Sequence, residues 1–178
     1  RIDRNTGGIV IAAKTAEGLR VMNQKIRDRE LKKYYLCIVH GTLPRPAGRL
    51  EGYILKDEAK KQVTVSSRPR PGAKTAVTLY ETLAVRNGLS LVRCQLITGR
   101  THQIRAQFAA AGHPLLGDGK YGSERQNKRY GRSYQALYSY RLEFCFTTDA
   151  GALAPLDGQQ FQVEQVDFVT EYFPGFSL

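Results

Sequence analysis

The strongest constraint on the fold is a pair of strand patterns at residues 75–85 and 89–97, joined by Asn87-Gly88. An Asn-Gly pair adopts the positive φ angles of a two-residue hairpin turn at little cost, so it pairs the flanking strands in antiparallel fashion. The apolar run of residues 9–13 is typical of a buried strand. Further strand patterns lie at residues 33–39, 136–147 and 160–168, and weaker ones at residues 52–55 and 62–66. We therefore expect an α+β fold with a mixed, largely antiparallel β-sheet and flanking helices and loops.

Two segments predict helices beside this sheet. Thr15 is a suitable N-cap for the first helix, in which Leu19, Met22 and Ile26 share one face. The second helix begins at Thr101, after a glycine turn, and carries apolar residues at helical spacing. Both helices are expected to bury their apolar faces against the sheet.

The charge of the chain indicates a polyanionic partner. Its 178 residues include 27 Lys and Arg against 16 Asp and Glu, which gives a formal net charge of +11. Nucleic acid fits this charge better than a membrane, because no apolar stretch approaches the ~20 residues of a spanning helix. Residues 119–135 read as a polar, basic, Tyr-rich loop and are predicted to bind phosphates without reading sequence.

The cysteines indicate a reducing compartment. Cys37, Cys94 and Cys145 are far apart, odd in number and set in largely apolar surroundings. Metal sites usually show paired short spacings, and secreted disulfide frameworks are denser. We therefore expect reduced core cysteines, no metal site and a cytoplasmic location.

Three short segments carry polar groups where a fold alone does not require them. Residues 1–8 place Asp3 before an apolar run, residues 32–35 open a strand with Lys-Lys-Tyr-Tyr, and residues 98–105 open a helix with several cations. The structural alternatives are a surface turn capped by Asp3, a sheet edge and a solvated helix face. Cations at a helix N-terminus oppose the helix dipole, so the third segment favours an anionic partner, which is either a phosphate or a protein carboxylate.

Together these segments resemble the RluA-type family of RNA pseudouridine synthases. Residues 1–8 are similar to the family's catalytic motif and supply Arg1, Ile2, Asp3, Thr6 and Gly8 in register; residues 33–35 resemble its Lys-x-Tyr motif. Residues 98–105 resemble its Gly-Arg-Thr-His-Gln-Ile-Arg signature, and residues 112–118 with Tyr121-Gly122 resemble the continuation. The chain departs from the pattern at Gly7, where the motif has Ser, and at Cys37, where a small Ala is usual.

The resemblance implies an enzyme that isomerises specific uridines to pseudouridine in structured RNA, with ribosomal RNA favoured over tRNA. It implies that Asp3 is the nucleophile, that Arg105 pairs with it and that Tyr35 packs against the flipped base. The pairing predicts a salt bridge between Asp3 and Arg105 in the folded protein. It also implies that no cofactor is needed. The side chains expected to bind RNA are Arg1, Arg4, Lys33, Arg100, His102 and Gln103.

The resemblance also bears on domain organisation. Residues 1–178 are expected to form one catalytic domain and to act as a monomer. The family places further strands, and often a separate RNA-binding domain, before the catalytic motif, so we expect this chain to lack both. Two other classes remain open: a non-catalytic RNA-binding module, and another RNA-modifying enzyme such as a methyltransferase. No Gly-rich nucleotide-binding loop follows a strand, which speaks against the methyltransferase.

Overall fold

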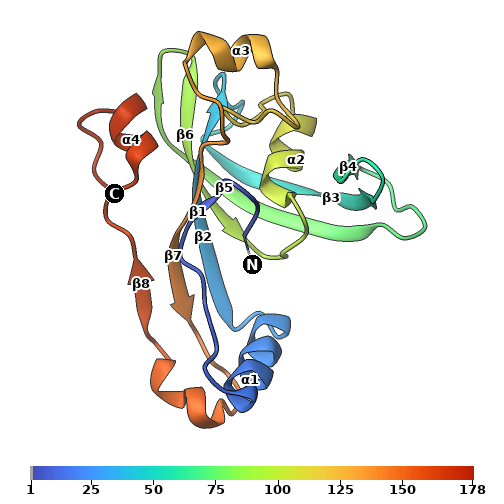
Figure 1. The fold of residues 1–178 in the computed structure, drawn as a ribbon, viewed down its shortest axis with the longest axis vertical. Helices are drawn as coiled ribbons and strands as arrows, with labels where there is room; N and C mark the ends of the chain where they lie inside the picture. Colours follow the sequence, from blue (N-terminus) through green and yellow to red (C-terminus); the bar gives the residue numbers. More distant parts are fainter. Residues whose placement is uncertain (1) are drawn as a thin grey trace.

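The computed structural model describes residues 2–178 and shows one eight-stranded sheet with short helices around it (Figure 1). The strand order is β1-β7-β2-β6-β5-β3-β4, with β8 paired to β7. The β1–β7 pair is parallel and the remaining pairs are antiparallel, which confirms the predicted mixed, largely antiparallel α+β fold. The elements are β1 (Gly7–Gly8), α1 (Ala16–Arg27), β2 (Leu31–His40), β3 (Ala47–Asp57), β4 (Gln62–Ser66), β5 (Lys74–Arg86), β6 (Leu89–Leu96), α2 (Gln103–Ala110), α3 (Glu124–Arg129), β7 (Leu137–Phe144), the 3-10 helix η1 (Gly151–Leu156), β8 (Gln160–Gln162) and α4 (Asp167–Tyr172).

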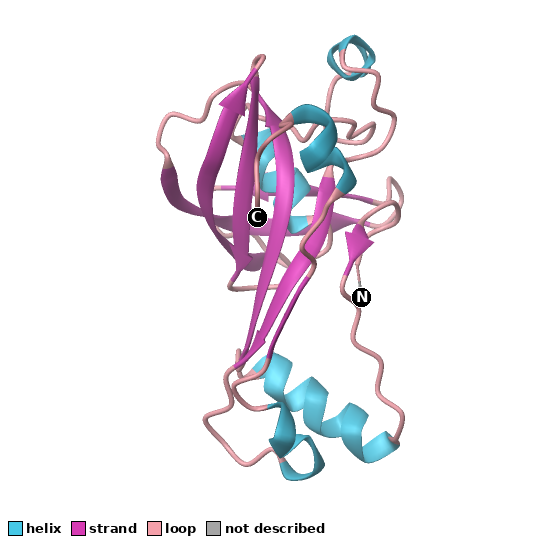
Figure 2. Cartoon of the chain, turned by 90° about the vertical axis from the view of Figure 1, so that its left-hand side faces the viewer, coloured by secondary structure: helices cyan, strands magenta, loops and turns pink. Residues whose placement is uncertain are grey.

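The predicted hairpin forms the middle of the sheet. Strands β5 and β6 pair from Thr78 with Leu96 to Arg86 with Leu89. Asn87 and Gly88 connect them with φ angles of 50° and 74°, as a two-residue turn of this kind requires. The sheet is strongly elongated along β2 and β7, and their far end carries α1 and η1 (Figure 1, Figure 2).

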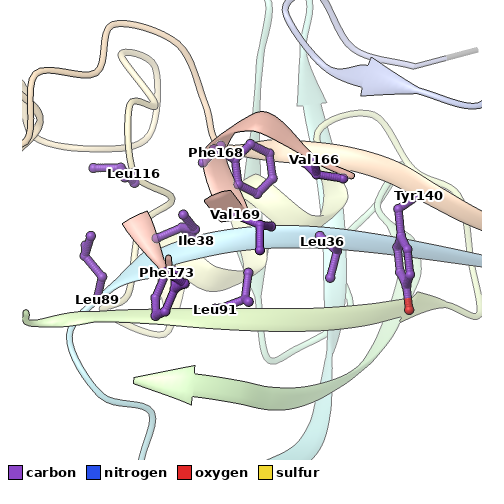
Figure 3. Close-up of a cluster of buried hydrophobic side chains, with 11 residues drawn as sticks. Leu36, Ile38, Leu89, Leu91, Leu116, Tyr140, Val166, Phe168, Val169 and Phe173 are labelled. Atoms are coloured by element: carbon purple, nitrogen blue, oxygen red, sulfur yellow. The ribbon is translucent and has the colours of Figure 1, made fainter. Parts of the chain in front are cut away.

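The largest core cluster lies between the sheet and the C-terminal segment (Figure 3). Leu36 and Ile38 of β2 and Leu91 of β6 are fully buried there, and Phe168 and Val169 of α4 pack over them. Burying side chains of this size stabilises a fold by roughly 1.5–3 kcal/mol each. Within residues 2–178, no helix combines the length and the apolar character that crossing a membrane requires.

The apolar run of residues 9–13 does not form the predicted buried strand. Strand β1 ends at Gly8, and Val10 and Ile11 are 58% and 37% exposed. The reason is competition for one sheet edge: β8 pairs with residues 141–143 of β7, where a longer β1 would have continued. An apolar sequence pattern cannot reveal that another segment occupies its pairing partner.

The first helix has the predicted start but a different buried face. Thr15 caps α1 by accepting a hydrogen bond from the Gly18 N–H at 3.0 Å. Met22 is buried as expected, whereas Leu19 and Ile26 are exposed. The buried face instead includes Lys25, whose charge is balanced in the interior by a carboxylate, so its burial was not evident from hydropathy.

Two further expectations need correction. Residues 119–135 are not a continuous loop, because Ser123 caps the six-residue helix α3 with its hydroxyl. Residues 160–168 do not form one strand either, since β8 ends at Gln162 and α4 begins at Asp167. Both are short elements stabilised by tertiary contacts, which a local pattern does not reveal.

Candidate active site

Helix α2 is fixed to the sheet by buried amides near its N-terminus. The Gln103 side chain donates to the Val77 carbonyl at 3.0 Å and to the Thr78 hydroxyl at 2.9 Å. Its oxygen accepts from the Thr98 hydroxyl at 2.8 Å and from the Arg100 N–H at 3.0 Å. Gln103 is 3% exposed and its amide is fully hydrogen-bonded inside the protein. This geometry contradicts the expectation that Gln103 binds RNA and gives it a structural role.

Arg105 lies two residues further along α2 and is buried against a carboxylate. Its Nε and Nη2 donate to the two oxygens of Asp118 at 2.7 and 2.9 Å, which is a bidentate pair. Burial opposes the charge of Arg105, but the attraction of Asp118 outweighs it and raises the pKa of Arg105. One of the two anionic partners predicted for this segment, a protein carboxylate, is thus found at Arg105.

Asp3 approaches the same guanidinium from the N-terminal segment. Its Oδ2 lies 3.6 Å from Nη1 of Arg105, and its side chain is 23% exposed. The predicted salt bridge between the two residues is therefore confirmed. A turn closed by the Thr6 N–H on the Asp3 carbonyl, at 3.1 Å, shapes this segment. Gln135 fixes the turn to the sheet by donating to the Arg4 carbonyl.

Two side chains of β2 face the same region. Tyr35 is half-buried; burial raises the pKa of its hydroxyl, and the nearby charge of Asp3 acts in the same direction. Its phenol therefore stays protonated at neutral pH. The Nζ of Lys33 would lie 3.4 Å from a Cβ placed on Gly99, so this ammonium reaches the loop before α2. Burial lowers the pKa of Lys33.

His102 and Tyr121 also lie beside Arg105. The Tyr121 hydroxyl accepts from the Val63 N–H at 2.9 Å and lies 2.8 Å from Nδ1 of His102. Since this hydroxyl has one proton to donate, the geometry favours a neutral His102 that accepts at Nδ1. Burial lowers the pKa of His102, which agrees with that assignment. The Arg105 guanidinium lies over the Tyr121 ring, 5.3 Å from its centre.

The remaining RNA-binding candidates lie around this cluster, except for Arg1, which is outside the described residues. Arg4 is exposed beside Asp3. Arg100 is half-buried and donates from Nε to the Thr75 carbonyl at 2.9 Å, which leaves its other nitrogens available. These positions are compatible with phosphate contacts.

The site contains two residues that the sequence analysis did not single out, Asp118 and Tyr121. Both belong to the segment that resembles the family's continuation after the helix, so the signal was present in the motif. Their charge or hydroxyl alone did not distinguish them from other loop residues. Among residues 2–178, no group of three His, Cys, Asp or Glu side chains is arranged to hold a metal ion.

The geometry favours nucleophilic chemistry. A partly exposed carboxylate stands at the rim of a cluster whose interior holds a guanidinium, a second carboxylate and two phenols. The guanidinium orients the outer carboxylate without enclosing it. A planar base could stack on the aromatic side chains beside it.

The chain is similar in sequence to known RNA pseudouridine synthases. A family model described as RNA pseudouridylate synthase matches residues 1–110. An uncharacterised RNA pseudouridine synthase of Mycoplasma genitalium is 39% identical over 149 residues, covering 81% of this chain and 45% of the relative. The ribosomal large subunit pseudouridine synthase C of Escherichia coli is 32% identical over 153 residues, covering 83% of this chain and 47% of the relative.

A solved structure has the same fold. Human RNA pseudouridylate synthase domain containing 1 superimposes with a TM-score of 0.70 at 20% identity, covering 96% of this chain and 77% of that structure. The chain spans about half the length of the curated relatives it matches.

Proposed function

Because this chain belongs to the RluA-type family of RNA pseudouridine synthases, we propose that it isomerises uridine to pseudouridine in RNA with Asp3 as the nucleophile. The observation that supports the proposal best is the convergence of Asp3, Arg105 and Tyr35, which come from three separate parts of the chain. A module that only binds RNA has no need for a carboxylate held by a buried guanidinium at a partly exposed rim. Asp3 repels phosphates, so its presence in a basic protein favours chemistry.

The reaction exchanges one glycosidic bond for another. The bond between N1 and C1′ of the uridine breaks, a bond between C5 and C1′ forms, the hydrogen on C5 leaves as a proton and N1 gains one. The Asp3 carboxylate attacks either C1′ of the ribose or C6 of the base, and the resulting covalent bond breaks again before product release. Both routes need a carboxylate that the nucleoside can reach, and the Asp3 side chain is 23% exposed.

Tyr35 and His102 would contact the base. The target uridine must leave its stack, at a cost of a few kcal/mol, before it reaches Asp3. The ring of Tyr35 offers an apolar surface for the base. Because its hydroxyl stays protonated, Tyr35 would relay the C5 proton by accepting it while it releases its own proton to water or to N1 of the base.

The substrate we propose is structured RNA, and ribosomal RNA before tRNA, because one relative is named for the large ribosomal subunit. Arg4, Lys33 and Arg100 would hold phosphates around the flipped nucleotide, and the basic residues of 119–135 would hold flanking phosphates. We further propose a cytoplasmic monomer, in which the three free cysteines stay reduced.

Release of tritium from RNA labelled at C5 of uridine tests the proposal. The substrate is an unmodified large-subunit ribosomal RNA transcript, and an unmodified tRNA transcript serves for comparison. The complete gene product is used, since relatives are about twice as long as this chain. We expect tritium release from ribosomal RNA and pseudouridine at defined positions; binding without release would support the RNA-binding module instead.

A further inference from the structure

Asp118 is the most completely buried acidic group of the site. It is 0% exposed, and its Oδ1 accepts from the Lys120 N–H at 2.9 Å and the Tyr121 N–H at 3.1 Å, besides Nη2 of Arg105. Its Oδ2 accepts from Nε of Arg105 at 2.7 Å. Burial alone would raise the pKa of Asp118, but the bonds and charge of Arg105 hold it below its ordinary value. Asp118 is therefore an ionised carboxylate with both oxygens occupied.

This arrangement determines which nitrogen of Arg105 can contact Asp3. Nε and Nη2 share one edge of the guanidinium, and Asp118 occupies that edge. The contact with Asp3 is left to Nη1 at 3.6 Å, which is longer than a hydrogen bond. Two carboxylates thus share one cation, and Asp118 makes the shorter contacts with it. The oxygens of Asp3 remain free of a close donor from Arg105.

The backbone of Asp118 is fixed in turn by Asn127 of α3. The Asn127 side chain accepts from the Gly117 N–H at 2.9 Å and donates to the Asp118 carbonyl at 3.3 Å. The same oxygen of Asn127 lies 3.1 Å from Nε2 of the buried His40, which donates to it. A Cβ on Gly117 would lie 2.0 Å from the Tyr134 carbonyl oxygen, so a side chain at position 117 would displace this loop.

We propose that Asp118 is a positioning residue for the reaction: it fixes the plane of Arg105 and takes up the greater part of its charge, so that Asp3 is oriented but not bound by both its oxygens. Asn127 supports this by fixing the loop that carries Asp118. The inference rests on the proposed function, and it goes beyond the pairing of Asp3 with Arg105. It predicts that removing the charge of Asp118 hampers chemistry and not RNA binding.

The test is the single-turnover rate of the Asp118→Asn variant with the C5-tritiated ribosomal RNA transcript. Asn retains one oxygen for the Lys120 and Tyr121 N–H groups. Its NH₂ group then replaces the oxygen that faces Nε of Arg105. The freed guanidinium edge is expected to turn toward Asp3 and tie up its oxygens. We expect turnover to fall about 10- to 100-fold, as for a small displacement of reacting groups, with RNA affinity unchanged.

A double-mutant cycle with Arg105→Lys separates positioning from a general structural effect. If Asp118 acts through Arg105, Asp118→Asn costs much less turnover in the Arg105→Lys background than in the wild type. Multiplicative losses would overturn the proposal. If Asp118→Asn does not fold, Asn127→Ala takes its place, because it removes the hydrogen bonds to the Gly117 N–H and the Asp118 carbonyl without adding a charge. That variant should also lose turnover severalfold at unchanged affinity, and wild-type turnover would overturn the proposal.

Asp157→Asn is the matched control. Asp157 also fixes a loop, accepting from the Phe146 N–H at 2.8 Å, but it lies at the end of η1 and at the far end of the sheet (Figure 1). The Asp157→Asn variant should release tritium at the wild-type rate. Absence of tritium release from the wild-type protein would refute the proposed function itself. Wild-type release with equal release from Asp118→Asn would refute only the role of Asp118.

Discussion

Replacing Asp3 with Asn should abolish turnover and leave the fold almost as stable as before. Asn keeps the shape of the side chain and part of its hydrogen bonding, but it cannot form the covalent intermediate. If the Asp3–Arg105 pair were fully buried, losing one partner would cost ~3–5 kcal/mol. The structure gives a smaller value. Asp3 is 23% exposed and 3.6 Å from Arg105, while Arg105 keeps two shorter bonds to Asp118.

The variant therefore leaves no unpaired buried charge, and the loss should resemble that of an exposed ion pair, about 1 kcal/mol or less. For a chain of this size that corresponds to a fall in Tm of about 2–4 °C. Arg105→Met is the contrasting variant, because it leaves the buried Asp118 without its cation. Its expected cost is ~3–5 kcal/mol.

Urea unfolding followed by circular dichroism measures both stabilities, filter binding measures RNA affinity, and tritium release measures turnover. We expect folded, RNA-binding Asp3→Asn protein without turnover, because a nucleophile acts in the transition state. Release at the wild-type rate by the folded variant would refute Asp3 as the nucleophile. A loss of stability as large as that of Arg105→Met would refute the assignment of Asp118 as the main partner of Arg105.

Three further predictions concern binding, pH and backbone geometry. Replacing exposed cations in residues 119–135, beginning with Arg125→Ala, should not abolish turnover. It should reduce the slope of log RNA affinity against log salt concentration by roughly 0.7 per lost contact on single strands. A slope equal to that of the wild type would contradict this. A hydrogen bond from Lys25 lowers the pKa of Glu30 from 4.5 to about 2. The stability that the Glu30 carboxylate contributes is therefore complete above pH 4.5 and is lost as pH falls toward 2. Melting curves of Glu30→Gln should accordingly depend less on pH in that range than those of the wild type. Gly8→Ala should lower both Tm and turnover, because a Cβ at this positive φ would lie 2.2 Å from the Ser139 carbonyl oxygen. The backbone strain alone costs of order 1–3 kcal/mol. An unchanged Tm would show that β1 does not depend on this glycine.

Much of the sheet was predictable because its signals are local. The turn residues Asn87 and Gly88 carry their conformational preference wherever they occur, and the strand that became β4 was predicted at residues 62–66 and found at Gln62–Ser66. The errors arise where a second segment decides the outcome. Residues 9–13 have a strand sequence, but β8 takes their place on β7. The burial of Lys25 depends on Glu30 and on the Thr148 carbonyl, 123 residues away in the chain.

The candidate site shows the same division. The motif predicted the pairing of Asp3 and Arg105, because both residues stand in it at defined places. It did not separate side chains that face the site from those that build it. Gln103 stands between His102 and Ile104 in the same motif, yet its amide is fully hydrogen-bonded to β5 and to the loop before α2. A polar residue in a motif can thus be fixed by the needs of the scaffold alone.

The position of Asp3 depends on weak local structure. Strand β1 has only two residues, and its parallel pairing with β7 begins four residues after Asp3. Between them, the turn is fixed by Gln135, whose side chain reaches the Arg4 carbonyl and, at 3.3 Å, the Thr6 hydroxyl. Arg105, by contrast, is fixed by a helix and a saturated carboxylate. In the proposed reaction Asp3 first bonds to the nucleoside and then releases it, and a carboxylate with few contacts beside a cation with many would suit that reaction. Arg105, held by α2 and Asp118, therefore sets the direction of the Asp3 carboxylate, while the two-residue strand β1 and the turn held by Gln135 set its distance from the sheet.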